Sequence, residues 1–255
     1  MQWGVHAMVD LPRRVLRITG SDRSKFLQDL VTNDVKGLDT GLVYAALLTP
    51  QGKYLADFFL VPDEDAILID LPEVLAAGVQ TRLNMYRLRS DVQIISTDLS
   101  VARGLGPSPD GAFADPRHPD MGWRAYDGRD HDTQDWAGLR VSLGLPEATR
   151  DLTPDSFILE MGFERFNGVD FRKGCYVGQE VTARMKHKTT LRKGLARVAI
   201  DGPAPVGSDI IVNERAAGQL TSRVGDIGLA YLRFDRANQG NMMADTSKIT
   251  LLDDC

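Results

Sequence analysis

Two β-rich runs separated by four residues constrain the fold more than any other feature of this sequence. They are Leu42–Thr49 (LVYAALLT) and Tyr54–Val61 (YLADFFLV), and the linker between them is Pro50-Gln51-Gly52-Lys53. A proline followed closely by a glycine suits a hairpin loop, because Gly52 can take a positive φ angle without steric cost. The sequence therefore predicts an antiparallel hairpin in the first quarter of the chain.

The elements around this hairpin predict an α+β fold. Residues 14–19 (RVLRIT) alternate as a strand does, and Ser21 is suited to cap a helix that ends near Val31. Further strands are expected at 66–70 and 92–96, with an amphipathic helix between them that has Pro72 in its first turn and ends near Leu88. This order favours antiparallel hairpins over a series of βαβ units.

The remainder of the chain divides into three parts. Residues 104–122 are rich in Gly, Pro and Asp, and we expect a loop there, the segment best suited to disorder. Residues 133–143 predict a helix with Trp136 on its apolar side. From residue 195 onward, short alternating runs and glycines predict a small β-barrel or sandwich. The expected domains are 1–190 and 191–255.

Composition excludes several classes of protein. Of 255 residues 43% are hydrophobic and 25% charged, which is typical of a soluble globular chain, and the net charge of −5 argues against a nucleic-acid-binding surface over the whole molecule. No apolar run approaches the length of a membrane span, and the N-terminus has no signal-peptide core. These features predict a cytoplasmic location.

The cysteines and histidines give no metal-binding pattern. The only cysteines are Cys175 and Cys255, which form no disulfide framework and no CxxC pair, and the four histidines are scattered. We therefore expect no tightly bound metal. Phosphate-binding and hydrolase motifs of the Gly-rich, P-loop and GxSxG types are missing as well.

The segment 168–188 (GVDFRKGCYVGQEVTARMKHK) holds one of these cysteines. Gly174 and Gly178 bracket Cys175, so the backbone there can turn sharply or approach a ligand closely. Lys173 and the start of a helix at about residue 179 both favour the thiolate form of Cys175. The alternative is a buried, inert cysteine.

Charge around this segment is strongly positive. Between Arg172 and Lys193 seven Lys or Arg side chains stand against one acid, Glu180, which can pair with Arg184 at i,i+4. Such a run suits an anionic ligand tail or an RNA backbone, and the alternative is a solvated helix face.

The motif KGCYVGQE (173–180) resembles the signature of the YgfZ family of folate-binding proteins. These are related to the T-protein (aminomethyltransferase) of the glycine cleavage system and share a superfamily with mitochondrial iron–sulfur assembly factors. The resemblance extends over VLRITGSDRSKFLQDLVTNDV, LLTPQGKYLADFFL and GQLTSRVGDIGLAYLR. It implies two interleaved ferredoxin-like α+β subdomains and a C-terminal β-barrel, arranged in a ring around a folate site.

The resemblance also implies a set of site residues. Cys175 and Lys173 would be the reactive pair. The residues expected to bind tetrahydrofolate or a derivative are Trp136, Tyr86, Asn33, Asp57, Tyr176, Gly178, Gln179, Glu180 and Arg184. The Trp136 indole would stack on the pterin or aminobenzoate ring, and the alternative is a core tryptophan.

Two departures from the aminomethyltransferases bear on function. Aminomethyltransferases carry a pair of carboxylates on the strand after the hairpin turn, where this chain has Ala56-Asp57. They also carry a glutamate in a helix at the position that Ser142 occupies here. Losing these acids removes groups that would stabilise charge during aminomethyl transfer. We therefore expect a folate-binding accessory protein that supports iron–sulfur cluster assembly or repair, including that of tRNA-modifying enzymes. Its partners would be folate and iron–sulfur enzymes or assembly proteins, without direct nucleic-acid binding. The alternative is a folate-dependent one-carbon transferase.

Overall fold

The computed structural model describes residues 10–187 and 190–252, and these form two compact units. The first, which we call the sheet unit, comprises Leu11–Gln134 and Phe163–Arg184. The barrel unit comprises Asp10, Asp135–Gly162 and the described residues from Met185 onward. This division differs from the expected single boundary at 190/191, because the segment that begins at Asp135 packs with the barrel.

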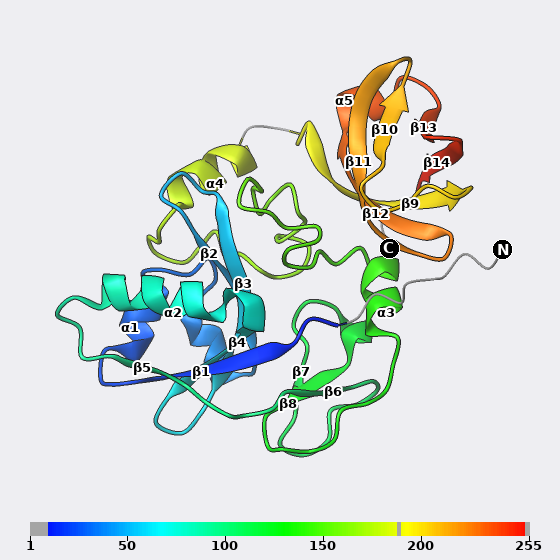
Figure 1. Cartoon of the computed structure of the whole chain (residues 1–255). Coiled ribbons are helices and arrows are strands. Elements are labelled where there is room, and N and C mark those ends of the chain that lie inside the picture. Colours follow the sequence, from blue (N-terminus) through cyan, green and yellow to red (C-terminus); the bar gives the residue numbers. More distant parts are fainter. Residues whose placement is uncertain (1–9, 188–189, 253–255) are drawn as a thin grey trace. The chain divides into compact units, whose positions relative to one another are not determined.

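A five-stranded antiparallel sheet forms the centre of the sheet unit, in the order β2-β3-β4-β1-β5 (Figure 1). Its strands are β1 (Arg13–Thr19), β2 (Val43–Leu48), β3 (Tyr54–Pro62), β4 (Ile67–Pro72) and β5 (Gln93–Ser96). The predicted hairpin is β2–β3, in which Ala46 lies opposite Asp57 and Gly52 takes a φ of 73°. The α+β class is confirmed.

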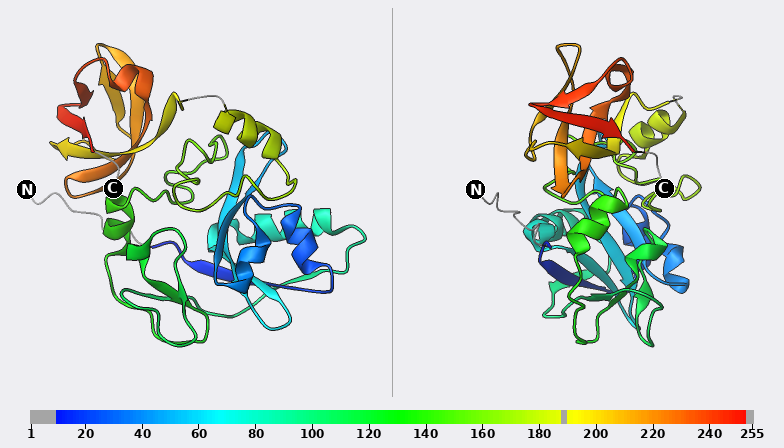
Figure 2. Two further views of the ribbon diagram at one scale, coloured as in Figure 1. Left: turned by 180° about the vertical axis from the view of Figure 1, so that it is seen from behind. Right: turned by 90° about the vertical axis from the view of Figure 1, so that its right-hand side faces the viewer.

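Two helices cover one face of this sheet (Figures 1 and 2). They are α1 (Arg23–Gln28) and α2 (Glu73–Arg87), whose apolar sides pack with Phe58, Leu60 and Ile69 in a single core. Burial of each such side chain stabilises the fold by about 1.5–3 kcal/mol. Helix α1 is shorter than predicted and begins after Asp22, since the Ser21 hydroxyl donates to Asp91 over 2.8 Å.

The other face of the sheet is polar and aromatic. Because strand residues alternate between faces, Tyr44, Asp57, Phe59 and Asp70 lie opposite the helical side. The expected disordered loop contributes to the cover of this face, and the prediction of disorder there is wrong. It forms β6 (Ala102–Gly104), β7 (Phe113–Ala114), a 3-10 turn η2 (Pro119–Met121) and β8 (Trp123–Ala125).

Buried ion pairs explain why this Gly- and Pro-rich segment is ordered. Arg124 of β8 is 2% exposed, and its guanidinium donates to Asp70 over 3.0 Å and to Asp115 over 3.1 Å. Arg13 also bonds to Asp70, over 2.6 Å. The two acids have lowered pKa values, because the arginines outweigh the opposing effect of burial.

The barrel unit contains a closed barrel of strands in the order β10-β11-β12-β9-β14-β13, as the alternating C-terminal runs predicted. These strands are β9 (Lys193–Asp201), β10 (Asp209–Val212), β11 (Arg215–Val224), β12 (Ile227–Arg233), β13 (Met242–Ala244) and β14 (Ser247–Leu251). Helix α3 (Trp136–Ser142) packs on β11 and β12, and a short α5 (Phe234–Ala237) follows β12. Arg140 of α3 bonds to Ser222 of β11 over 2.9 Å.

The remaining elements are η1 (Val35–Asp39) and α4 (Gln179–His187). Helix α4 confirms the helix expected after the cysteine motif. The sequence predicts this helix as far as Lys188, which lies outside the described residues. A search of the described helices finds none with the length and apolar character that crossing a membrane requires.

Candidate functional site

The motif cysteine lies on a short loop of the sheet unit, residues 171–178, which we call the Cys175 loop. Gly174 and Cys175 are exposed, whereas the residues on either side, Lys173 and Tyr176, are only 6% and 7% exposed. The Cys175 thiol is free of any disulfide. The loop therefore presents a thiol between two buried anchors, and the alternative of a buried cysteine does not hold.

Lys173 fixes the loop to the end of α1. Its ammonium donates to the backbone oxygen of Gln28 over 2.7 Å and to that of Val31, and it lies 5.0 Å from the centre of the Tyr176 ring. The end of a helix offers free carbonyl groups, which a cation satisfies well. Burial lowers the pKa of Lys173 to about 8, although nearby aspartates oppose the shift.

This geometry changes the role expected of Lys173. The sequence suggested that its charge holds Cys175 as a thiolate, but the ammonium is bonded to carbonyl oxygens of α1 and faces the Tyr176 ring. Lys173 is thus an anchor of the loop. The sequence could not show this, because α1 lies about 145 residues earlier in the chain.

Gly178 seats the end of the loop against the β2–β3 hairpin. Its φ is 86°, and a Cβ at this position would lie 2.7 Å from the backbone oxygen of Thr49. A Cβ on Gly52 would likewise lie 2.9 Å from that of Val181 in α4. Both glycines permit the hairpin and the start of α4 to touch. At Gly174, by contrast, a Cβ would meet nothing within 4 Å.

The chain that leads into the loop is held by hydrogen bonds from Thr32 and Asn33, which follow α1. The Thr32 hydroxyl donates to the Gly168 carbonyl over 2.7 Å, and the Asn33 amide donates to the carbonyls of Asn167 and Tyr44 over 2.7 and 2.8 Å. Thr32 is fully buried, so this bond is shielded from water. The loop is therefore held at both ends.

Asp57 forms a second polar centre in the sheet unit. Its carboxylate accepts hydrogen bonds from the hydroxyls of Tyr44 over 3.0 Å and Tyr54 over 2.6 Å, and it is 7% exposed. Burial, and then the charge of Asp57, raises the pKa of both tyrosines well above the usual value. The Asn33 amide bonds to the backbone carbonyl of Tyr44 and Asp57 to its hydroxyl, so both residues contact Tyr44 but at its two ends.

Arg117 also belongs to this polar centre and was not identified from the sequence. Arg117 stacks 5.6 Å from the centre of the Tyr44 ring and 4.8 Å from that of Phe59, and it pairs with Asp115 over 2.8 Å. It lies in the segment expected to be disordered, so it was missed. The alternating pattern of β3, which points Asp57 and Phe59 to the same side, was the available clue.

Other predicted site residues lie elsewhere. Tyr86 belongs to α2 and packs against the apolar core, on the opposite face of the sheet from Asp57, so these two residues do not line one site. Trp136 belongs to α3 of the barrel unit and is 3% exposed, which is typical of a core tryptophan. The Glu180–Arg184 pair does form, over 2.9 Å, but both side chains are well exposed.

The described part of the chain holds no group of three or more His, Cys, Asp or Glu side chains that could bind a metal ion. Cys255 lies outside the described residues. A cluster at Cys175 would therefore need additional ligands from outside these residues, since iron–sulfur clusters are commonly held by several thiolates.

Comparison with known proteins identifies the barrel and the fold. A family described as CAF17, C-terminal beta-barrel domain, matches residues 192–253. Glycine cleavage system aminomethyltransferase T from Bartonella henselae superposes with a TM-score of 0.72, at 13% sequence identity, over 94% of this chain and 82% of that one. The chain therefore shares its fold with that aminomethyltransferase.

Similar sequences include several iron–sulfur cluster assembly factors. The mitochondrial iron–sulfur cluster assembly factor IBA57 of Mus musculus is 30% identical, over 94% of this chain and 80% of its own length. Its Homo sapiens counterpart is 31% identical, over 86% and 75%. These relatives are named mitochondrial, which contradicts the predicted cytoplasmic location. They support the superfamily that the resemblance indicated, though not the YgfZ family in particular. The chain belongs to the family of the iron–sulfur cluster assembly factor IBA57.

Proposed function

We propose that this protein supports the assembly or repair of iron–sulfur clusters, with the Cys175 thiol as the group that contacts the cluster in transfer. The observation that carries the proposal is the exposed thiol fixed between two buried anchors, Lys173 and Tyr176. A thiolate is the usual protein ligand of a cluster. The partners would be iron–sulfur enzymes or assembly proteins, including those that modify tRNA.

The surroundings of Cys175 suit a ligand shared with another molecule. One thiolate fills only part of the coordination of a cluster, so a partner or a small thiol must supply the rest. Gly174 has an ordinary φ and open space at its Cβ position, so neither backbone strain nor internal packing requires a glycine there. A glycine beside the thiol instead leaves room for the cluster and its carrier.

An anaerobic reconstitution tests the thiol role. The protein would be incubated with ferric iron, sulfide and glutathione, and cluster formation followed by visible absorption and, after reduction with dithionite, by electron paramagnetic resonance. We expect a cluster signal with the wild type and none with Cys175→Ser. Equal signals from both proteins would refute a role for Cys175 as a ligand.

The second part of the proposal is that the sheet unit binds tetrahydrofolate or a derivative near Tyr44. Asn33 bonds to the backbone of Tyr44, and the hydroxyls of Tyr44 and Tyr54 fix the orientation of the Asp57 carboxylate. A reduced folate supplies a pterin whose amino group donates hydrogen bonds that a fixed carboxylate accepts. Tyr86, on the other face of the sheet, is not part of this site.

Calorimetric titration with tetrahydrofolate tests this part. We expect binding by the wild type and at least about tenfold weaker binding by Asp57→Asn, since a charge-assisted hydrogen bond would be lost. Trp136→Ala would show whether the barrel unit contributes. Undiminished affinity in Asp57→Asn would exclude a site at this carboxylate.

A further inference from the structure

The solvent side of helix α2 is unusually apolar. Val74, Met85 and Leu88, the residue after the helix, are 66%, 70% and 88% exposed. Helical spacing places them on one stripe, which we call the α2 stripe. Its members are Val74, Ala77, Gly78, Thr81, Met85 and Leu88, all exposed and all uncharged.

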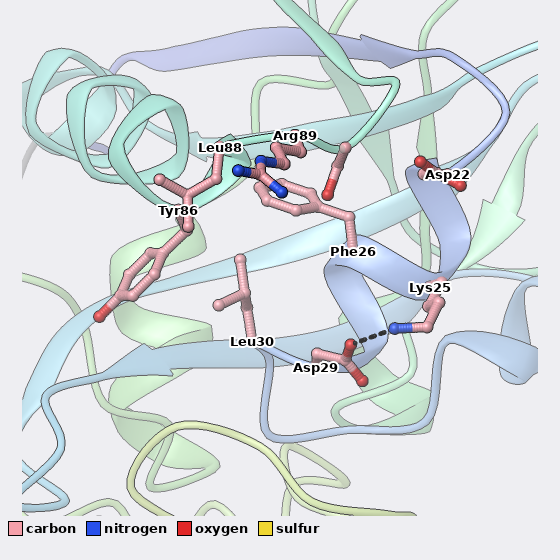
Figure 3. Close-up of a pocket in the computed structure, with 9 residues that line it drawn as sticks. Asp22, Lys25, Phe26, Asp29, Leu30, Tyr86, Leu88 and Arg89 are labelled. Atoms are coloured by element: carbon pink, nitrogen blue, oxygen red, sulfur yellow. Dashed lines mark hydrogen bonds and ion pairs between the residues drawn. The ribbon is translucent and has the colours of Figure 1, made fainter.

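A groove lies at each end of this stripe. Figure 3 shows the larger one, of about 970 Å³, where Phe26 and Leu30 face Tyr86, Leu88 and Arg89. The smaller groove, of about 210 Å³, lies beside Val74, Gly78 and Arg82. A Cβ on Gly78 would meet nothing within 4 Å, so no internal contact requires a glycine inside this helix.

Leu88 is held in an unfavourable backbone conformation. Its φ is 40°, a region that disfavours any residue with a Cβ and that glycine usually occupies after a helix. Its side chain gains nothing inside the fold, because it is 88% exposed. Strain of this kind is found mostly where the residue serves a function, and here the exposed side chain is the feature that remains to be explained.

The charge around the stripe favours one kind of occupant. Among the described residues, the guanidinium groups of Arg82 and Arg89 have no hydrogen-bond or ion-pair partner. Asp29 pairs with Lys25 and Glu73 with Arg14, whereas Asp22 and Asp91 accept hydrogen bonds from neutral groups and keep their charge. Against these two carboxylates stand three arginines that have no carboxylate partner among the described residues, Arg82, Arg87 and Arg89. The free charge along the stripe is therefore positive.

We propose that the α2 stripe docks an amphipathic helix of a partner protein, apolar on one face and acidic along its edges. A helix in a groove is a common mode of recognition, and its acidic edges would meet Arg82 and Arg89. A second copy of this chain would bring arginine against arginine. An anionic membrane surface would also face the rest of the chain, whose net charge is −5, whereas a single helix contacts only the stripe.

The probe for this proposal is a fluorescein-labelled helical peptide of about 20 residues, with leucines at i, i+4, i+7 and i+11 and glutamates beside them. Fluorescence anisotropy would compare it with a peptide that carries lysines in place of the glutamates. We expect the full-length protein to bind the acidic peptide at least about tenfold more tightly.

Variants locate the binding. Met85→Glu, Leu88→Gly and Arg82→Glu should each weaken binding about tenfold or more. Leu88→Gly relieves the backbone strain, so its melting temperature should not fall below that of the wild type, which separates binding from folding. The matched control is Val206→Glu, which replaces a 53% exposed apolar residue of the barrel unit and should leave binding unchanged.

Three results would overturn the proposal. They are equal affinity for the acidic and basic peptides, undiminished binding by Leu88→Gly and Met85→Glu, and a different occupant. A different occupant would appear as self-association that Met85→Glu abolishes in sedimentation, or as Met85-dependent binding to phosphatidylcholine–phosphatidylserine vesicles. The stripe contains no residue of the Cys175 loop, so its failure would leave the proposed function standing.

Discussion

The two sides of the five-stranded sheet bury positive charge in different ways. On the polar face, Arg13, Arg117 and Arg124 pair with carboxylates, and although burial opposes it, the pKa values of Arg13 and Arg117 are raised. On the helical side, Lys173 is buried against backbone carbonyls, and its pKa falls to about 8. A carboxylate compensates a buried charge, whereas a carbonyl dipole does so only in part.

This contrast assigns different tasks to the two sides. The arginine–aspartate network fixes a Gly-rich segment that has few apolar residues to bury, and so it serves the fold. Lys173 holds a single loop, the one that presents Cys175. Substitutions on the polar face should therefore change global stability, and substitutions around Lys173 should change mainly the loop.

The largest effect is expected from Asp70→Asn on the polar face. The change leaves Arg13 without its carboxylate partner and Arg124 with Asp115 alone. Buried positive charge is then no longer fully compensated, which costs about 3–5 kcal/mol of unfolding free energy. Chemical denaturation at neutral pH measures it. Since the pKa of Asp70 lies below its usual 3.8, the advantage of the wild type should be lost as the pH falls through the acid range. A loss below about 1 kcal/mol would mean that the network does not support the fold.

A smaller effect is expected from Gly178→Ala in the Cys175 loop. The added Cβ would lie 2.7 Å from the Thr49 oxygen at a φ of 86°, so we expect a loss of about 1–3 kcal/mol. Gly174→Ala is the matched control, because a Cβ there meets nothing and its φ is ordinary. Thermal melts of the two variants compare them. Equal destabilisation would show that the loop does not rest on the hairpin as described.

Much of the fold can be predicted from the sequence, because the signals for it lie within short stretches of the chain. The hairpin at Gly52 and the C-terminal barrel depend on alternation and turn residues, which short windows contain. The Cys175 loop could be recognised from its glycines and its motif. The anchoring of Lys173 on α1 and the pairing of Asp70 with Arg124 join distant segments, so the sequence could not reveal them.

Lys173→Met should produce a change that depends on pH. In the wild type the pKa of Lys173 is about 8 when folded and 10.5 when unfolded, so the unfolded chain binds more protons between these values. The stability of the wild type should therefore rise, relative to the variant, as the pH increases from about 8 to 10. Denaturation curves at three pH values measure this difference, and a constant difference would contradict the burial of the ammonium.

The smallest effect is expected from Glu180→Ala. The pair with Arg184 is exposed on both sides, so its loss should cost no more than about 0.5 kcal/mol and less still at high salt. Thermal melts at low and high salt test this. A larger loss of stability would show that the Glu180–Arg184 pair does more than stabilise α4 as a surface ion pair.

The central claim is that the Cys175 thiol, fixed between Lys173 and Tyr176, serves iron–sulfur cluster assembly. The direct measurement is the activity of a cluster-dependent enzyme in cells that lack the corresponding native factor and produce either the wild type or Cys175→Ser. Immunoblots would confirm equal protein levels. We predict restored enzyme activity with the wild type and loss of that activity with Cys175→Ser, whereas full restoration by Cys175→Ser would contradict the account.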